Sequence, residues 1–249
     1  YVVPYNNIDA LEAMFEKNAK KIACFIVEPV LENLAIILPD AGYLERVREL
    51  CDQYDVVLIF DEVKTGLTAG AHGASARLGV KPDLITLAKS IGGGLPLAAF
   101  GGKKKYMDFV TNGKMAHFGT FNGNPLAMAG VRAIDRICSD QVLVDAEAMN
   151  LQALTRIGEV IDEYQLPAHT VGFGIKGCVT WSTTPVRNYR DYKATDFGVA
   201  EAHWLFALNR GIITPPGLDE QWLISVAHGQ TEIDMLVEDF REFAKAIRA

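Results

Sequence analysis

Two apolar runs, each ended by a charged residue, are the strongest constraint on how this chain folds. Residues 56–60 (VVLIF) end at Asp61, and residues 84–88 (LITLA) end at Lys89. Short runs rich in Val, Ile and Leu predict strands that are buried on both faces of a parallel sheet. Ligands of such sheets bind just beyond the carboxyl ends of the strands. We therefore expect Asp61 and Lys89 to face the same crevice.

A glycine-rich turn follows Lys89. Residues 90–96 read SIGGGLP, and glycine lets the backbone pass very close to another group because it has no Cβ. Partial burial of a lysine beside such a turn would make its amine nucleophilic and suited to Schiff-base chemistry. An aspartate at the neighbouring strand end suits another task, which is to keep a pyridinium nitrogen protonated. These are the two protein groups that a pyridoxal 5'-phosphate (PLP) site requires.

Each of these residues also has a purely local interpretation. Asp61 can cap the turn that follows its strand, and Lys89 can be a solvated residue at the start of a helix. Taken singly, those interpretations are favoured. The glycine turn beside Lys89 shifts the balance towards a shared site.

Five stretches of the sequence carry a resemblance to a known family. They are IACFIVEPV (22–30), LIFDEVKTGL (58–67), PDLITLAKSIGGGLPLAAFGG (82–102), GTFNGNPLAMAG (119–130) and LISVAH (223–228). On these motifs, which occur in the family's order, the chain resembles the class III aminotransferases of PLP fold type I. Within that family it is most similar to the glutamate-1-semialdehyde 2,1-aminomutases.

The resemblance implies a role for four residues. Lys89 would form the Schiff base with PLP, and Asp61 would pair with the pyridine nitrogen. Val63 would pack on one face of the cofactor ring. Thr120 would bind the cofactor phosphate of the partner subunit, which implies a homodimer with shared active sites.

Two further residues are candidates for the substrate side of the site. His117 lies just before the GTF turn, and a turn-stabilising histidine is an equally good interpretation. Glu220 corresponds to an acidic residue that the aminomutases use near the substrate, and the alternative is a glutamate of a surface loop. Residues 31–34 (LENL) depart from the family, where Ala-Gly or Gly-Gly is expected near the cofactor.

The alternation of strand and helix patterns predicts an α/β fold with a mostly parallel sheet. We expect a PLP-binding large domain over residues 1–141, incomplete at its N-terminal side, and a small α+β domain over residues 142–249. The family's ring-stacking aromatic residue and main phosphate loop are expected upstream of residue 1.

One motif points elsewhere and is rejected. Residues 172–177 (GFGIKG) satisfy the dinucleotide fingerprint G-x-G-x-x-G, which requires a strand before it and a helix after it. The next residues (CVTW) predict a strand instead. These glycines are therefore expected to mark tight packing in a small sheet.

Composition excludes several other classes of function. The net charge of −7 and the pI of about 5.3 argue against nucleic acid and anionic membranes as partners. The four cysteines are scattered, so neither a metal site nor a disulfide framework is indicated. A cytoplasmic protein with reduced thiols is expected.

The predicted function is amino-group transfer on a small amino acid or amino-aldehyde. A PLP-dependent racemase or decarboxylase of the same family would use the same Asp61 and Lys89. An inactive homologue that serves as a scaffold is the alternative from another class of protein.

Overall fold

The computed structural model describes residues 1–215 and 221–248, and the chain divides into two compact units. The first unit comprises Tyr1–Pro29 and Pro39–Ser139, and the second comprises Val30–Leu38 and Asp140–Ala249. The predicted boundary lies near residue 141. The second unit also takes up Val30–Leu38, a segment that the prediction places in the first domain.

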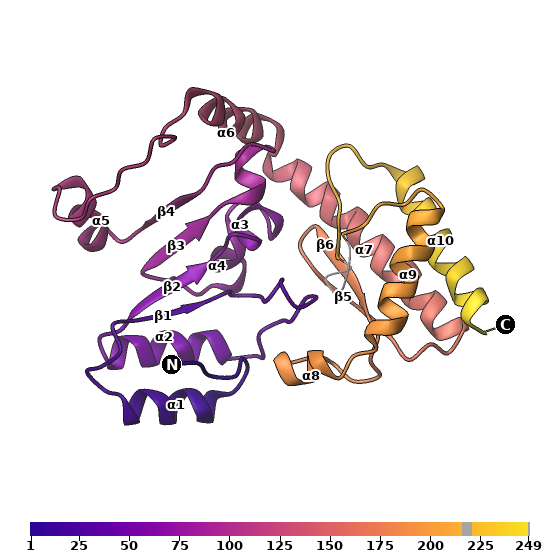
Figure 1. Cartoon of the computed structure of the whole chain (residues 1–249), viewed down its shortest axis with the longest axis horizontal. Helices are drawn as coiled ribbons and strands as arrows, with labels where there is room; N and C mark the ends of the chain where they lie inside the picture. Colours follow the sequence, from indigo (N-terminus) through magenta and orange to yellow (C-terminus); the bar gives the residue numbers. More distant parts are fainter. Residues whose placement is uncertain (216–220, 249) are drawn as a thin grey trace. The chain divides into compact units, whose positions relative to one another are not determined.

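A four-stranded sheet is the centre of the first unit (Figure 1). The first three strands are parallel neighbours and the fourth is antiparallel to the third, so the sheet is mostly parallel, as predicted. In order, they are β1 (Cys24–Val27), β2 (Val57–Asp61), β3 (Leu84–Leu87) and β4 (Ala99–Gly102). The first unit is therefore an α/β structure with a mostly parallel sheet.

The two faces of this sheet are buried to different extents. Leu58 and Phe60 of β2 are completely buried, whereas Val57 and Ile59, which alternate with them, are only half-buried. Helix α2 (Tyr43–Gln53) contacts β2, and α1 (Ile8–Lys17) packs beside α2. The prediction of strands buried on both faces is wrong for this chain, because successive residues of a strand point to opposite faces and one face is incompletely covered.

Asparagine side chains cap the starts of two helices in the first unit. Asn7 Oδ1 accepts a hydrogen bond from the amide of Ala10 at 2.9 Å, and Asn124 Oδ1 accepts one from Leu126 at 2.9 Å. These bonds satisfy amides that lack a partner in the first helical turn. The remaining helices of the first unit are α3 (Thr65–Thr68), α4 (Gly73–Leu78), the 3₁₀ helix η1 (Lys89–Gly92), α5 (Lys104–Thr111) and α6 (Pro125–Ile137).

The second unit contains a three-stranded antiparallel sheet with helices packed on it (Figure 1). Helix α7 contacts β5 and β6, and α10 contacts α7 and α9. The elements are α7 (Asp140–Glu163), β5 (His169–Phe173), β6 (Lys176–Thr180), α8 (Tyr189–Lys193), α9 (Phe197–Asn209), β7 (Gln221–Leu223) and α10 (Gln230–Arg248).

The G-x-G-x-x-G motif lies in the hairpin between β5 and β6, so the rejection of a dinucleotide site is confirmed. A Cβ added at Gly177 would lie 2.5 Å from the ring of Trp222, which explains the glycine by close packing. Buried Asn150 donates to the carbonyls of Gly174 and Lys176 and accepts from Trp222 Nε1 at 2.7 Å. The side-chain amide of Asn150 therefore joins α7 to the β5–β6 turn, to β6 and to β7.

Among the helices of residues 1–215 and 221–248, none combines the length and the apolar character needed to cross a membrane.

Candidate active site

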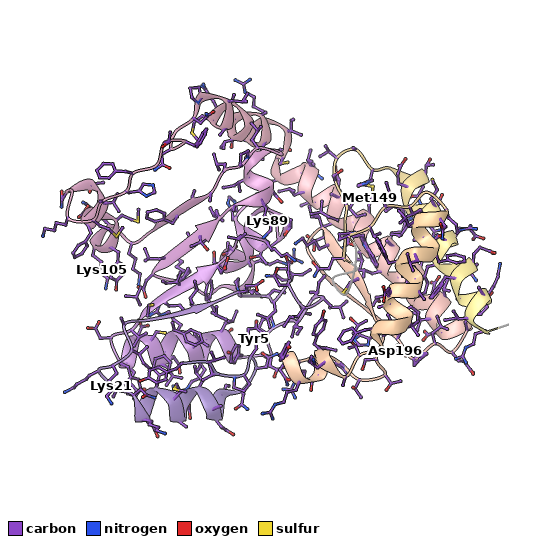
Figure 2. The ribbon with its side chains drawn as sticks, in the orientation of Figure 1. Tyr5, Lys21, Lys89, Lys105, Met149 and Asp196 are labelled. Carbon is purple, nitrogen blue, oxygen red and sulfur yellow. The ribbon has the colours of Figure 1, made fainter. Side chains whose placement is uncertain are left out.

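Asp61 and Lys89 lie at the carboxyl ends of two neighbouring parallel strands. Asp61 is the last residue of β2, where it pairs in register with Thr86 of β3. Lys89 follows β3 after one residue and begins η1. Figure 2 labels Lys89 near the ends of the sheet strands. Both residues therefore lie at the same edge of the sheet, and a shared crevice stays a prediction.

The Asp61 carboxylate is held by one of its two oxygens. Oδ1 accepts a hydrogen bond from the amide of Val63 at 3.1 Å and one from Thr86 Oγ1 at 3.2 Å. Among the described residues, no hydrogen bond ends on Oδ2. The local interpretation of Asp61 as the cap of the following turn is realised, and the second oxygen still remains available to a ligand N–H.

The adjacent Glu62 has a different environment. Its side chain is completely buried, and its oxygens accept hydrogen bonds from the amides of Ala74 at 2.6 Å and Ser75 at 2.9 Å. Such charge-assisted bonds to backbone amides are strong where water is excluded. A Cβ at Gly73 would lie 2.4 Å from Glu62 Oε2, so this glycine makes room for the carboxylate. Glu62 thereby fixes the turn that carries Asp61 and Val63.

Lys89 has an unusual backbone conformation. Its φ angle is +52°, in the left-handed region that residues with a Cβ rarely adopt. Such strain persists only where the surrounding structure imposes it, and it is concentrated at functional sites. Gly93, at the end of η1, has φ +59°, and a Cβ there would approach Ile134 of α6 to 3.0 Å. Lys89 itself is exposed, so the expected partial burial is wrong for the described chain.

A hollow of about 660 Å³ in the first unit collects several of the candidate residues. Val63, Thr86 and His117 line it, together with residues 121–124 of the loop before α6. Asp61, Lys89 and Thr120 are not among its lining residues, all of which belong to the described chain. The structure therefore brings Val63 and His117 together and leaves Thr120 outside this space.

His117 is engaged with its own loop. Its Nε2 lies 3.3 Å from Asn122 Nδ2, and its ring meets Phe100 edge-on with the ring centres 5.1 Å apart. These contacts match the turn-stabilising interpretation. His117 is nevertheless exposed, so its ring is also accessible from the hollow.

Thr120 lies in the middle of an exposed apolar loop. The neighbouring Phe118 and Phe121 are 92% and 80% exposed, and Thr120 is itself exposed. Glu220, which like His117 is predicted for the substrate side of the site, lies outside the described residues.

In the second unit, the departure from the family at Glu32 has a structural explanation. Glu32 is completely buried, and its Oε2 lies 2.6 Å from Lys176 Nζ, whose side chain is 9% exposed. Gln221 Nε2 donates to the backbone carbonyl of Glu32 at 2.8 Å. A buried carboxylate requires such a countercharge and satisfied neighbours. Lys176 therefore makes a glutamate tolerable at this position.

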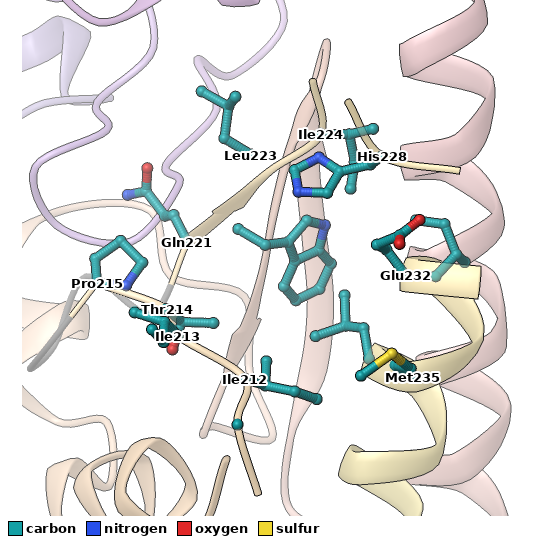
Figure 3. A pocket seen from close by; sticks show the side chains of 14 residues that line it. Ile212, Ile213, Thr214, Pro215, Gln221, Leu223, Ile224, His228, Glu232 and Met235 are labelled. Carbon is teal, nitrogen blue, oxygen red and sulfur yellow. The ribbon is translucent and has the colours of Figure 1, made fainter. Parts of the chain in front are cut away.

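A second hollow, of about 440 Å³, lies in the second unit (Figure 3). Ile212, Ile213 and Met235 contribute apolar side chains to it. Two of its polar residues form hydrogen bonds in and near the turn before α10: His228 Nδ1 accepts from the amide of Ser225 at 2.9 Å. Glu232 accepts from the amide of Gly229 at 2.7 Å, a bond that lowers the pKa of Glu232. This hollow is thus mainly a packing feature.

Sequence reasoning missed two residues of the site. Thr86 donates a hydrogen bond to Asp61 itself. Glu62 holds the turn that carries Asp61 by accepting from the amides of Ala74 and Ser75. A polar Thr within the apolar run LITL was the available signal for Thr86.

Comparison with known families decides the relationship. The family model "Aminotransferase class-III" matches residues 3–188, which is most of the chain. The chain belongs to the class III aminotransferase family. The prediction made from the five motifs is thereby confirmed.

Curated relatives of this class III chain include two named glutamate-1-semialdehyde 2,1-aminomutase. The protein from Thermomicrobium roseum is 38% identical over 97% of this chain and 56% of its own length. The protein from Methanocorpusculum labreanum is 39% identical over 96% of this chain and 57% of its own length. The chain thus spans just over half the length of these relatives.

Solved structures share the fold of this class III chain. An omega-transaminase from Sphaerobacter thermophilus superposes with a TM-score of 0.93 at 28% identity, over 100% of this chain and 57% of that one. A glutamate-1-semialdehyde-aminomutase from Pseudomonas aeruginosa PAO1 in complex with PMP gives a TM-score of 0.88 at 25% identity, over 98% and 56%.

Proposed function

We propose that the complete protein is a PLP-dependent aminotransferase or aminomutase that acts on a small amino acid or amino-aldehyde. The observation that carries the proposal is the Asp61 carboxylate, held by one oxygen and open at the other, beside the strand that precedes Lys89. Membership of the class III family and the aminomutase relatives support it.

The donor set of the chain fits PLP. A carboxylate oxygen with no partner among the described residues can accept the N–H of a pyridinium ring, and an exposed lysine amine at the next strand end can reach an aldehyde. Val63 is fixed relative to that carboxylate through its own amide, which suits a side chain that packs on a ring. Bound PLP supplies an electron sink for the carbanion formed at the substrate Cα.

Each residue then has a defined task. Lys89 would hold the cofactor through its Nζ and would carry a proton to and from the substrate as general base and acid. Asp61 keeps the ring nitrogen protonated and fixes the orientation of the ring. Val63 excludes water from one ring face. His117 is proposed for the substrate side because it lines the hollow that also contains Val63.

We further propose that two copies of the complete protein share their active sites, with Thr120 binding the phosphate in the partner's site. Six exposed apolar side chains surround Thr120 in sequence and favour coverage by a second copy. They are Phe109, Met115, Phe118, Phe121, Leu126 and Met128. A cytoplasmic location is proposed because all four cysteines are free thiols.

The fate of an isotopic label distinguishes the candidate reactions. The complete protein with PLP is given a ¹⁵N-labelled amino substrate, such as glutamate-1-semialdehyde, and a 2-oxo acid. Transfer of ¹⁵N to the acceptor identifies an aminotransferase, and movement of ¹⁵N within one molecule identifies an aminomutase. Loss of chirality or release of CO₂ without transfer would identify a racemase or a decarboxylase. Failure to bind PLP at all would contradict the proposal and favour the inactive homologue.

A further inference from the structure

Thr86 is the residue of the Asp61 site to which no role has been assigned. We infer that Thr86 is a positioning residue, which holds Oδ1 of Asp61 so that Oδ2 faces the ring nitrogen of the cofactor. This inference rests on the proposed function, since it concerns the acid that pairs with the ring. The contact that carries it is the hydrogen bond from Thr86 Oγ1 to Asp61 Oδ1, at 3.2 Å.

The backbone around Thr86 is fixed on both sides. Thr86 is the register partner of Asp61 in β2 on one side and of Phe100 in β4 on the other. Its carbonyl also accepts a hydrogen bond from the amide of Glu62 at 3.0 Å. The hydroxyl therefore meets Asp61 from a rigid strand, which is the kind of element that holds a functional group accurately.

Two donors on one oxygen restrict the rotation of the carboxylate. The terminal torsion of an aspartate is broad and roughly two-fold, so a single donor leaves the plane of the carboxylate poorly defined. The amide of Val63 and the hydroxyl of Thr86 come from different elements and converge on Oδ1. Their combined geometry leaves Oδ2 as the oxygen that points away from both.

The hydroxyl is the part of Thr86 that this role requires. Within the run LITL, valine would satisfy strand propensity and packing equally well, because both residues are β-branched and of similar size. Thr86 is only half-buried, and it lines the hollow that also contains Val63. Its hydroxyl is thus at the edge of the proposed cofactor space.

The test uses the complete protein loaded with PLP that is ¹⁵N-labelled at the ring nitrogen. The ¹⁵N chemical shift reports whether that nitrogen is protonated, independently of turnover. In Thr86→Val we expect the pH midpoint of ring-nitrogen protonation to fall by about one unit and kcat to fall about tenfold, since hydrogen bonds to charged groups are worth ~1.5–3 kcal/mol. Thr86→Ser keeps the donor and should stay within about threefold of the unsubstituted protein in kcat.

Thr68→Val is the matched control. Thr68 is buried, and its hydroxyl donates to the Lys64 carbonyl at 2.6 Å. Thr68→Val therefore also removes a threonine hydroxyl and its hydrogen bond, but one that does not involve Asp61. It should leave the ¹⁵N shift unchanged. If Thr86→Val does not fold, Thr86→Ala and Thr86→Ser carry the comparison, because they differ only by the hydroxyl.

An unchanged ¹⁵N titration and kcat in folded Thr86→Val, or in Thr86→Ala relative to Thr86→Ser, would overturn the inference while leaving the proposed function intact. Absence of bound PLP in the unsubstituted protein would instead overturn the proposed function, and the role of Thr86 with it.

Discussion

Asp61 and Glu62 are adjacent in sequence, but their carboxylates differ in burial and in hydrogen bonding. The buried Glu62 carboxylate accepts hydrogen bonds from the amides of Ala74 and Ser75 and from the Thr65 hydroxyl. Asp61 is held by Oδ1 and open at Oδ2. The completely buried Glu62 therefore fixes the turn, whereas the half-buried Asp61 keeps one carboxylate oxygen available to a ligand.

Replacing Asp61 by Asn tests the charge of this residue separately from its shape. Asn Oδ1 can still accept from Val63 and Thr86, so the melting temperature should change by no more than a few degrees. Loss of the charge-assisted bond to the ring nitrogen should lower kcat about a hundredfold or more, since each ~1.4 kcal/mol of transition-state stabilisation is tenfold in rate. Steady-state kinetics on the complete protein measure this change.

Asp108→Asn is the control for Asp61→Asn, because Asp108 forms only an exposed pair with Lys104 and should leave kcat unaltered. A loss in Asp61→Asn of less than tenfold would mean that the acid only caps its turn.

The sequence predicts the two candidate cofactor residues better than it predicts the residues that hold them in place. Asp61 and Lys89 are visible because a charge interrupts each apolar run. Thr86 and Glu62 are not, because their partners lie 12 to 25 positions away and are known only from the fold. The left-handed backbone of Lys89 is likewise invisible, since no residue preference predicts a lysine there.

Among the elements, a buried aspartate joins the starts of the strands that carry the site. Asp83 is 3% exposed; its Oδ2 accepts from the amide of Leu58 at 2.8 Å and from Arg48 at 2.9 Å, and its Oδ1 lies 2.6 Å from Lys103 Nζ. Burial alone would raise the pKa of Asp83. The bonds from Lys103, Leu58 and Arg48 outweigh burial and hold this pKa at about 2.

The depressed pKa predicts an acid-sensitive contribution to stability. The folded-state pKa of about 2 lies below the ordinary value of 3.8, so the stabilisation is complete above pH ~4 and is lost as the pH falls towards 2. The shift corresponds to about 2 kcal/mol. In urea unfolding at several pH values, the free energy of unfolding of the complete protein should therefore fall below pH ~4, and that of Asp83→Asn should not show this fall.

Asp108→Asn again serves as the control, since an exposed pair contributes ~0–1 kcal/mol. Equal acid sensitivity of Asp83→Asn and the unsubstituted protein would contradict the assignment of this contribution to Asp83.

Local sequence signals predict the elements well where capping or close packing determines them. Asparagine is a preferred N-cap residue, and Asn7 and Asn124 cap α1 and α6. The glycines of residues 172–177 lie in a small sheet, as expected. Burial of both sheet faces could not be judged from the sequence, since it depends on what covers each face.

At the scale of the whole molecule, family membership follows from motifs spread over the chain, whereas long-range pairing does not. Glu32 and Lys176 are 144 positions apart, and only the fold reveals their buried ion pair. This ion pair and the hydrogen bonds from Gln221 to the carbonyls of Glu32 and Ala35 join Val30–Leu38 to the rest of the second unit.

A shared active site predicts that two inactive variants complement each other. We expect Lys89→Ala and Thr120→Glu each to abolish turnover, the second because its charge repels the phosphate. After subunit exchange, a mixed dimer contains one site with both native residues. An equimolar mixture should then recover about a quarter of the native activity.

Mixing Lys89→Ala with Asp61→Asn is the control, since both residues belong to the same subunit's contribution to a site. Its mixed dimers combine an altered residue from each chain with Thr120 from the partner, so no site has both Lys89 and Asp61. No recovery with Thr120→Glu after confirmed exchange would place Thr120 in its own subunit's site.

Covalent trapping tests whether Lys89 holds PLP. The complete protein is incubated with PLP, reduced with borohydride and digested, and the modified peptide is identified by mass spectrometry. The pyridoxyl label should be on Lys89, and Lys89→Ala should bind PLP without being labelled. A label on another lysine, or no label in a protein that is folded and saturated with PLP, would contradict the account.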